Sequence, residues 1–349
     1  MAAARRRLLV QAMTFEGDAS GQAVAKAIAR CPAPDRRVLV DSYSRFFISD
    51  RMVVSPAYLL DRPFREEVKA TFAMFRSLAA GGVGVRATNP FGPLYTGRPF
   101  RNHKKIIVAD DVAYVGGINF SDHNFEWPDL MLRIEGPAAD LLAQDFEWTY
   151  RGEGRAWTAD AGEVRLFGLD GRTNPSAFAP LVELIAGASR SVFVISPYFS
   201  FPFLEALGRA AAGGAEVTLV TPMANNKPFI RDYLSWAAPR LGIQVRLVPH
   251  MIHLKGILVD EATLIVGSAN FDFVSYRAEE EIVAVVSDPQ VCNAFEREVA
   301  QPALAASSPP LRLPLSALKG RLSLAALKTV DAAIGALGWD RRTAVDWRY

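Results

Sequence analysis

Apolar stretches of strand length alternate with alanine-rich helical stretches along the chain, and one polar-studded stretch occurs twice. Residues 103–119 read HKKIIVADDVAYVGGIN, and residues 253–270 read HLKGILVDEATLIVGSAN. Both run His, one residue, Lys, four residues, Asp, and then an apolar strand that ends in Gly-Gly or Gly-Ser and an Asn. A repeat of this kind predicts two copies of one structural unit.

The segments upstream of each copy also match in order. The pattern of RVLVDSY at 37–43 matches that of SVFVISPY at 191–198, and the pattern of GGVGVR at 81–86 matches that of GGAEVTLV at 213–220. Strands that alternate with helices indicate an α/β fold. We therefore predict two α/β domains related by a pseudo-twofold axis, each a mixed sheet flanked by helices.

A segment rich in glycine, charge and turn residues, at 151–175, separates the two halves. We predict a first half over residues 1–160 with its motif at 103–110. A second half is predicted over 161–300 with its motif at 253–260, followed by a C-terminal tail over 301–349.

The tail contains a helical stretch that is amphipathic and basic. Its apolar and basic positions are Leu318, Leu322, Leu327, Ile334, Lys319, Arg321 and Lys328. Such a helix lies on an anionic membrane surface or packs its leucines against the second half. Both interpretations stay open at this point.

Insertions into the repeated scaffold are expected to select the substrate. The first half carries an insertion at 44–70 that includes RFF at 45–47, and the second carries one at 223–250. Together with NPFGPLY at 89–95 and PYFSFPF at 197–203, the RFF stretch could form an apolar rim for acyl chains or belong to the core.

Composition excludes several classes of protein. Lys and Arg number 39 against 37 Asp and Glu, so the chain lacks the general basic field of dedicated nucleic-acid binders. Cys31 and Cys292 lie far apart and predict neither a disulfide nor a zinc site. The apolar stretch behind three N-terminal arginines is interrupted at Gln11 and is short for a signal peptide, and no window is long enough to span a membrane. We expect a cytoplasmic protein, associated peripherally with the inner face of the cell membrane.

The two His-Lys pairs suit chemistry at phosphorus. His103 and Lys105 lie two residues apart, as do His253 and Lys255, so each pair shares one face of an extended strand. An imidazole that attacks phosphorus needs a cation, donors for the phosphoryl oxygens, and a group that fixes its tautomer. A second, protonated histidine donates to the departing oxygen. The two halves, packed together, would supply both histidines to one phosphate.

The ends of the motif strands supply further candidate groups. We assign Asn119, Asn270 and Ser268 to phosphate binding, beside the two lysines. Asp110 and Asp260 complete the two catalytic motifs. Because each aspartate lies where the chain turns back, with parity opposite to the histidine, we expect it to cap the turn rather than transfer protons.

Two acids are candidates to orient the histidines. Asp129 comes directly before LMLRI and Glu281 directly before IVAVV, in matching order after the two motifs. We predict that each accepts a hydrogen bond from a histidine ring nitrogen. The remaining histidines, His123 and His250, are expected near the site or in structural roles. Strand alternation sends His250 and His253 to opposite faces, so no zinc site is predicted, and no cofactor is expected.

The doubled motif resembles the phospholipase D superfamily over residues 37–290. RNHKK at 101–105, YVGGINF at 114–120 and WPDLMLRIEGPAADLLAQDFEWTY at 127–150 look particularly like bacterial cardiolipin synthases. This resemblance implies phospholipase D-like halves with the active site at their interface, no metal, and phosphodiester exchange through a phosphohistidine. It assigns His103 as the nucleophile and His253 as the general acid and base.

Two features depart from the resemblance. The turn after Asp110 is one residue shorter than the turn after Asp260, and the N-terminal membrane helices common in cardiolipin synthases are absent. The leading hypothesis is a metal-independent, cardiolipin synthase-like phosphatidyltransferase acting on a phospholipid such as phosphatidylglycerol. A phospholipase D-type hydrolase, a nuclease of the superfamily and a non-catalytic lipid-binding scaffold are the alternatives. We expect an anionic membrane surface as partner, no nucleic acid, and a functional monomer because the duplication supplies both halves.

Overall fold

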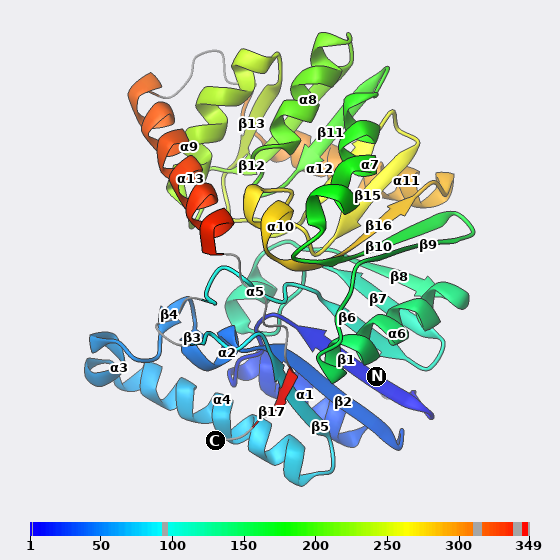
Figure 1. The fold of residues 1–349 in the computed structure, drawn as a ribbon, viewed down its shortest axis with the longest axis vertical. Helices are drawn as coiled ribbons and strands as arrows, with labels where there is room; N and C mark the ends of the chain where they lie inside the picture. The colour runs from blue at the N-terminus through cyan, green and yellow to red at the C-terminus, as the bar shows by residue number, and fades with distance from the viewer. Residues whose placement is uncertain (2, 93–96, 310–315, 338–343, 348–349) are drawn as a thin grey trace. The chain divides into compact units, whose positions relative to one another are not determined.

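The computed structural model of the chain forms two compact units (Figure 1). It describes residues 1, 3–92, 97–309, 316–337 and 344–347. Within these, the first unit holds residues 1–126, 131–155 and 344–347, and the second holds 127–130 and 156–337. Each unit is an α/β structure built on its own sheet, as the repeat predicted.

The first unit has a seven-stranded sheet in the order β17-β5-β2-β1-β6-β7-β8, and β3 and β4 form a separate ribbon. Its strands are β1 (Arg7–Ala12), β2 (Asp35–Asp41), β3 (Phe47–Ile48), β4 (Arg51–Met52), β5 (Gly84–Thr88), β6 (Ile106–Ala109), β7 (Val112–Gly116), β8 (Met131–Glu135) and β17 (Ala344–Asp346). Its helices are α1 (Ala19–Arg30), α2 (Tyr43–Phe46), α3 (Pro56–Leu60), α4 (Arg62–Ala80), α5 (Asp122–Glu126) and α6 (Pro137–Arg151). The strands β1, β2 and β5 are parallel and the other pairs antiparallel, so the sheet is mixed as predicted.

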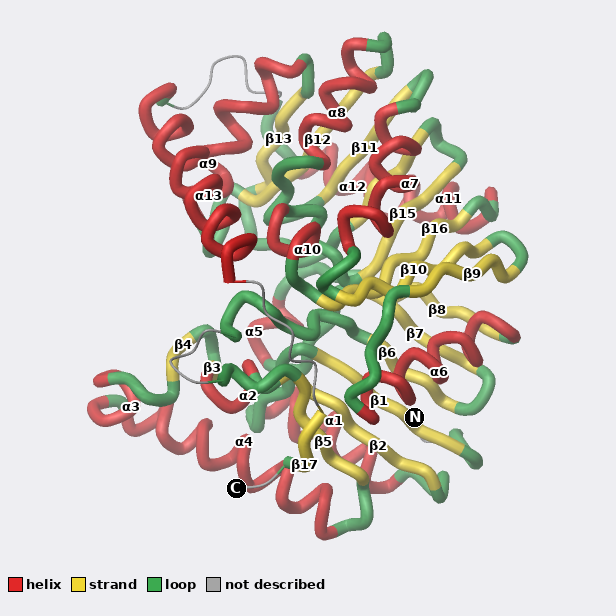
Figure 2. The backbone as a smooth tube through the Cα atoms, viewed as in Figure 1, coloured by secondary structure: helices red, strands yellow, loops and turns green. Residues whose placement is uncertain are grey.

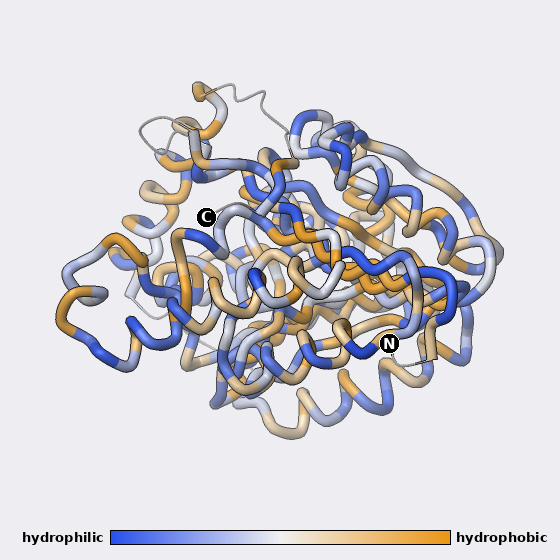
Figure 3. Tube along the Cα trace, turned by 90° about the horizontal axis from the view of Figure 1, so that it is seen from below, coloured by the Kyte–Doolittle hydropathy of each residue, from blue (hydrophilic) through white to orange (hydrophobic). Residues whose placement is uncertain are grey.

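Side-chain alternation along the strands gives the first sheet two apolar faces. Leu8 and Val10 of β1 join Ile28 of α1 and Phe75 of α4 in one core cluster. Leu9, of opposite parity, is also buried, and α6 packs against β1, β6 and β7. Figure 3 shows hydrophilic and hydrophobic residues following one another along the helical turns, a pattern typical of amphipathic helices.

The second unit has an eight-stranded sheet in the order β13-β12-β11-β14-β15-β16-β10-β9. Its strands are β9 (Trp157–Ala161), β10 (Val164–Asp170), β11 (Ser191–Ile195), β12 (Glu216–Pro222), β13 (Gln244–Val248), β14 (Gly256–Val259), β15 (Thr263–Gly267) and β16 (Glu280–Val286). Its helices are α7 (Asn174–Ala186), α8 (Phe203–Ala212), α9 (Pro228–Ala237), the 3₁₀ helix η2 (Ala238–Leu241), α10 (Phe273–Arg277), α11 (Pro289–Phe295), the π-helix η3 (Glu296–Ala300), α12 (Gln301–Ala306) and α13 (Ala317–Leu337). Figure 2 shows these helices packed over the strands.

Strand pairing corrects the upstream part of the predicted repeat. In each sheet the first motif strand, β6 or β14, pairs antiparallel with β1 or β11, and parallel strands follow in the order β2 and β5, or β12 and β13. Residues 37–43 therefore correspond to β12 and not to 191–198. Residues 81–86 lead into β5, whose counterpart is β13 and not the strand at 213–220.

The offset arises because β1 is missing from the predicted repeat. Its residues follow three arginines, and Gln11 interrupts the apolar pattern. In the structure Gln11 is buried, and its amide nitrogen donates to Asn102 Oδ1 at 2.9 Å, which offsets part of the cost of burying it. The segment 223–250 is consequently no insertion, because α9 and β13 are the counterparts of α4 and β5. The insertion at 44–70 is real, because only the first unit places α2, β3, β4 and α3 after its second strand.

The C-terminal part differs from the separate tail that we predicted. Helix α13 packs against α9 in the second unit, whereas β17 pairs with β5 in the first. Leu327 and Ile334 are buried, and a Cβ added at Gly320 would lie 2.2 Å from Trp236 Cβ on α9, so the helices approach closely. Residues 310–315, 338–343 and 348–349 of the predicted tail lie outside the described residues.

The aromatic segments predicted as an apolar rim belong largely to the two cores. The Phe203 ring packs edge-on against Phe178 at a centroid distance of 5.0 Å, and Phe199 is fully buried. Phe47 stacks on Tyr43 at 4.5 Å. Leu94 and Tyr95 lie outside the described residues.

Candidate active site

The second motif places His253 and Lys255 in an extended segment immediately before β14. The backbone N–H groups of His253 and Leu254 both donate to the carbonyl oxygen of Pro128, at 2.9 and 3.1 Å. Lys255 is buried, and its Nζ donates to the carbonyl oxygen of His253. These hydrogen bonds fix the backbone of the second motif directly before β14.

The imidazole of His253 contacts both an acid and a cation. Its Nδ1 lies 2.7 Å from Asp129 Oδ2 and 2.7 Å from Lys255 Nζ. A ring nitrogen either donates or accepts, so Nδ1 cannot serve both neighbours at once. An ionised carboxylate can only accept a hydrogen bond. We therefore infer that Nδ1 carries a proton and donates it in a hydrogen bond to Asp129, and that Lys255 Nζ donates to the carbonyl oxygen of His253. Proton transfer to a ligand then falls to Nε2.

Asp129 is held in its ionised form. Its side chain is 4% exposed, and this burial opposes ionisation, but the positive charges of Lys255 and His253 lower the pKa of the carboxyl below its usual value. The Leu130 N–H adds a hydrogen bond to Oδ1 at 2.8 Å. A carboxylate against Nδ1 fixes the tautomer of the ring and stabilises its protonated form. The structure thus gives Asp129 the contact expected from its place in the sequence.

Asp129 and Glu281 occupy equivalent positions in the two sheets. Met131 of β8 pairs with the last residue of β7, and Val283 of β16 pairs with the last residue of β15. Each acid lies two residues before its paired residue. The equivalence that we inferred from sequence order therefore holds in the strand register.

Glu281 is fully buried and accepts two hydroxyl hydrogen bonds. Ser268 Oγ donates to one carboxylate oxygen, and Ser275 Oγ donates to the other at 2.8 Å. Ser268 Oγ in turn accepts from the Ile282 N–H at 3.0 Å. A hydroxyl has one proton, and here Ser268 uses it on Glu281. The structure therefore shows Ser268 as a support for Glu281, and its role in phosphate binding stays a prediction.

The two asparagines are buried at the ends of the second motif strands. Asn119 Oδ1 accepts from the Thr14 N–H at 3.2 Å, which leaves its amide nitrogen as the donor end. Asn270 is fixed through its backbone, whose N–H donates to Ser275 Oγ at 3.3 Å and whose carbonyl accepts from Ser196 Oγ at 3.0 Å. Its side-chain oxygen has no hydrogen-bond partner among the described residues. Both side chains are pre-positioned with hydrogen-bonding capacity for a ligand.

Asp110 and Asp260 cap the start of a neighbouring strand. Asp110 accepts from the backbone N–H groups of Arg5, Arg6 and Arg7 at 2.8 to 3.1 Å, just before β1. Asp260 accepts in the same way from the N–H groups of residues 189–191 before β11, at 2.8 to 3.1 Å. Burial opposes the shift, but these donors lower the pKa of Asp260 to about 2. This is the capping geometry that position in the turn predicted.

The first motif uses its two lysines differently. Lys105 Nζ donates to the His103 carbonyl oxygen at 2.7 Å, which matches Lys255 in the second motif. Lys104 is fully buried and forms an ion pair with Asp145 of α6, with Nζ to oxygen distances of 2.8 and 2.9 Å. Lys104 therefore anchors the motif to α6, and Lys105 is the lysine associated with the histidine.

A buried network that sequence analysis missed holds the segment before His103. Asp41, at the end of β2, accepts from Arg101 Nη1 and from the Asn102 N–H, both at 2.7 Å. Asn102 Oδ1 accepts from the Gln11 amide at 2.9 Å and from the Lys104 N–H at 3.2 Å. The RN of RNHKK was the only available signal, because the partners lie far away in sequence.

The other two histidines have different surroundings. His123 lies in α5, with Nδ1 3.1 Å from Ser121 Oγ and Nε2 2.9 Å from Asn124 Nδ2. His250 is exposed, whereas His253 is buried.

Comparison with known proteins agrees with this geometry. Residues 181–302 match the family described as cardiolipin synthase, PLD-like domain. This match lies in the second half of the chain. Cardiolipin synthase 1 of Staphylococcus epidermidis is 28% identical over 248 residues, which cover 62% of this chain and 51% of that protein. Cardiolipin synthase A of Pseudomonas putida is 27% identical over 321 residues, which cover 84% of this chain and 62% of that protein.

The similarity in fold to a solved structure extends beyond the matched residues. Phosphatidylserine synthase of Haemophilus influenzae superposes with a TM-score of 0.66 at 15% identity and covers 96% of this chain and 90% of that structure. The resemblance indicated by the two motifs is therefore confirmed, and so is the predicted fold class. The chain spans about half to three-fifths of the length of the cardiolipin synthases named above.

Membrane-spanning capacity was searched over the described residues. None of the helices there combines the length and the apolar character needed to cross a bilayer.

Proposed function

We propose that this protein transfers a phosphatidyl group between alcohols, as a cardiolipin synthase-like phosphatidyltransferase. The observation that carries the proposal is the buried His253, whose Nδ1 is bound by ionised Asp129 while Lys255 lies beside the ring. This is the arrangement that a general acid and base at phosphorus requires. The similarity to proteins named cardiolipin synthase supports a phospholipid substrate.

The proposed reaction has two steps and needs both motifs at one phosphate. In the first, Nε2 of His103 forms a P–N bond while the P–O bond to the leaving alcohol breaks, and His253 donates its proton to that oxygen. In the second, His253 takes the proton of an incoming hydroxyl, whose oxygen forms a new P–O bond as the P–N bond breaks. Lys105 and Lys255 would offset the negative charge that gathers on the phosphoryl oxygens.

Two further roles follow from the pseudo-symmetry. Because Glu281 occupies the register position of Asp129, we propose that it orients His103 as Asp129 orients His253. Asn119 and Asn270 would donate their amide N–H groups to the phosphoryl oxygens. No resident metal is invoked in these steps, because the histidines supply the nucleophile and the acid.

Peripheral membrane binding through α13 is also proposed. Leu318 and Leu322 on this helix are 68% and 60% exposed, with Arg321 between them. The one acid of the helix, Asp331, is paired with Arg277. An apolar and basic outer face suits an anionic lipid surface.

Flotation with phosphatidylglycerol vesicles tests membrane binding through α13. The double variant Leu318→Glu with Leu322→Glu should lose binding to the vesicles. The control Met223→Glu, at another exposed apolar position, should keep it.

The activity is tested with purified full chain and vesicles of labelled phosphatidylglycerol. We expect cardiolipin and glycerol as products. Both His103→Ala and His253→Ala should reduce the rate by about 10³-fold or more, since each removes a participant in a covalent step. His250→Ala, at an exposed histidine, is the matched control and should retain the rate. Phosphatidic acid as the main product would identify a hydrolase instead, and the absence of product from any phospholipid would refute the lipid proposal.

A further inference from the structure

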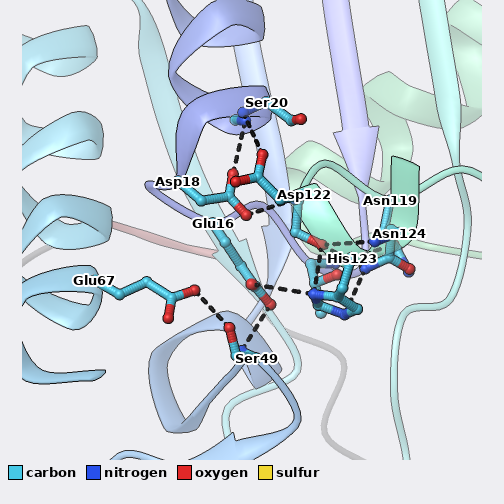
Figure 4. A network of polar contacts seen from close by, with 12 residues as sticks. Glu16, Asp18, Ser20, Ser49, Glu67, Asn119, Asp122, His123 and Asn124 are labelled. Carbon is cyan, nitrogen blue, oxygen red and sulfur yellow. Dashed lines mark hydrogen bonds and ion pairs between the residues drawn. The ribbon is translucent and has the colours of Figure 1, made fainter. Parts of the chain in front are cut away.

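Three carboxylates of the first unit converge away from the His-Lys motifs. Glu16 follows β1, Asp18 caps α1, and Glu67 lies on α4. One oxygen from each lies within 4.8 Å of the others. Figure 4 shows the Glu16 carboxyl group between Asp18, Glu67 and His123. We refer to Glu16, Asp18 and Glu67 as the carboxylate cluster.

Glu16 is the buried member of the carboxylate cluster, with 2% of the residue exposed. Its Oε1 accepts from the Ser49 N–H at 3.1 Å, whereas its Oε2 is buried without a hydrogen-bond partner among the described residues. A buried carboxylate oxygen beside two other acids is costly unless a positive charge occupies the space between them.

A histidine also lies beside Glu16 Oε2. His123 Nδ1 is 3.8 Å from this oxygen, too far for a hydrogen bond. The amide nitrogen of Asn124 lies 2.9 Å from the other ring nitrogen, Nε2, and can only donate, so Nε2 accepts. Nδ1 lies 3.1 Å from Ser121 Oγ. Both ring nitrogens thus have hydrogen-bond partners on α5 or directly before it, and neither forms a hydrogen bond with Glu16.

The geometry points to a divalent cation, and we propose that the carboxylate cluster is a Ca²⁺-type site. Carboxylate oxygens are the ligands of hard cations. Ca²⁺ binds oxygen at about 2.3–2.6 Å, so two ligands on opposite sides lie about 4.6–5.2 Å apart and other pairs lie closer, which fits oxygens within 4.8 Å of one another. Mg²⁺ needs shorter distances and near-ideal octahedral geometry, and soft metals prefer sulfur and nitrogen ligands.

Such an ion would fasten the insertion at 44–70 to the first sheet. Ser49, in the turn between β3 and β4, donates its N–H to Glu16 and its hydroxyl to Glu67 at 2.5 Å. The ion would therefore join the end of β1, the start of α1 and the insertion through a single centre. Binding to the folded chain alone raises stability with ion concentration.

The experiment compares full-length protein stripped with a chelator and titrated with CaCl₂ by calorimetry and thermal unfolding. We expect one saturable site with Kd on the order of 10–100 µM. The midpoint Tm should rise by about 5 °C at a hundredfold excess over Kd. Glu67→Gln should weaken Ca²⁺ binding at least tenfold. Glu66→Gln, at the exposed neighbouring acid, is the matched control and should bind as the wild type does.

Glu16→Gln distinguishes a bound cation from protonation of the Glu16 carboxyl group. If Ca²⁺ is the natural occupant, the Tm of this variant should not respond to Ca²⁺, whereas the Tm of chelated wild type should rise. If the wild type shows no binding at Ca²⁺ concentrations up to about 5 mM, a concentration above the Kd of weak extracellular sites, the proposal is overturned. An equal Tm rise in wild type and Glu67→Gln also overturns it. Neither result bears on phosphatidyl transfer, which is measured separately.

Discussion

Replacing Asp129 with asparagine tests the assigned tautomer of His253. The side chain keeps its size but loses the charge that binds Nδ1 at 2.7 Å. An asparagine amide can also donate to Nδ1, which would favour the tautomer with its lone pair there and its proton on Nε2. We therefore expect Asp129→Asn to lose more activity than Asp129→Ala, although asparagine is the closer match in shape.

The size of the effect follows from the contact that is lost. A hydrogen bond to a charged group contributes about 1.5–3 kcal/mol, which corresponds to about 10–150-fold in rate if it acts fully in the transition state. Asp129→Ala should fall in this range. The wrong tautomer adds to this loss, and the comparable change in a serine protease triad costs about 10⁴-fold. Asp129→Asn should therefore lose about 10³–10⁴-fold.

The assay is the initial rate of phosphatidylglycerol conversion, measured across pH for both variants. Glu126→Gln is the matched control, because this exposed acid precedes Asp129 by three residues, and it should retain the wild-type rate. Circular dichroism and the unfolding midpoint show whether each variant is folded. A folded Asp129→Asn variant with more than a third of the wild-type rate would refute the assigned role.

Three further outcomes concern the framework of the site. Asp260→Ala should lower the Tm at pH 7 and change the Tm little near pH 2. The pKa of Asp260 is lowered in the folded chain, so its stabilising contribution is complete above about pH 4 and is lost as the pH falls towards 2. An equal Tm loss at both pH values would contradict the capping role. Lys104→Ala should destabilise the first unit by about 3–5 kcal/mol, because Asp145 is left buried and unpaired, and urea unfolding should show partial recovery when Asp145→Ala is added. Gly320→Ala should cost about 1–3 kcal/mol by forcing α13 from Trp236, and an unchanged unfolding midpoint would show that the two helices do not need this approach.

The sequence was most informative where the repeat and local spacing carry the signal. The His-Lys spacing, the capping role of Asp110 and Asp260, and the equivalence of Asp129 and Glu281 all follow from order along the chain, and the structure agrees with each. The fold class followed from the same repeat. In these cases short-range pattern and strand register give the same answer.

Contacts between distant segments were not predictable in this way. The Asp41 network involves residues about 60 positions apart, and no pattern in either segment indicates the pairing. Strand β1 was missed because the buried Gln11 breaks its apolar pattern, and the partner of its amide nitrogen, Asn102, lies about 90 residues away. Ser268 was assigned to phosphate binding from its place at the end of the motif strand, and its hydrogen bond to Glu281, thirteen residues away, could not be predicted from that place. A side chain's partner decides its role, and the partner depends on the fold.

The central claim is a covalent phosphohistidine, and trapping it is the most direct test. The chain has four histidines, so an enzyme quenched in denaturant during turnover of labelled phosphatidylglycerol can be digested and all four peptides followed by mass. We predict an acid-labile phosphatidyl adduct on the His103 peptide, with His123, His250 and His253 unmodified, and no adduct in His103→Ala. An active enzyme without an adduct under conditions that preserve phosphohistidine, or an adduct on another histidine, would contradict the account.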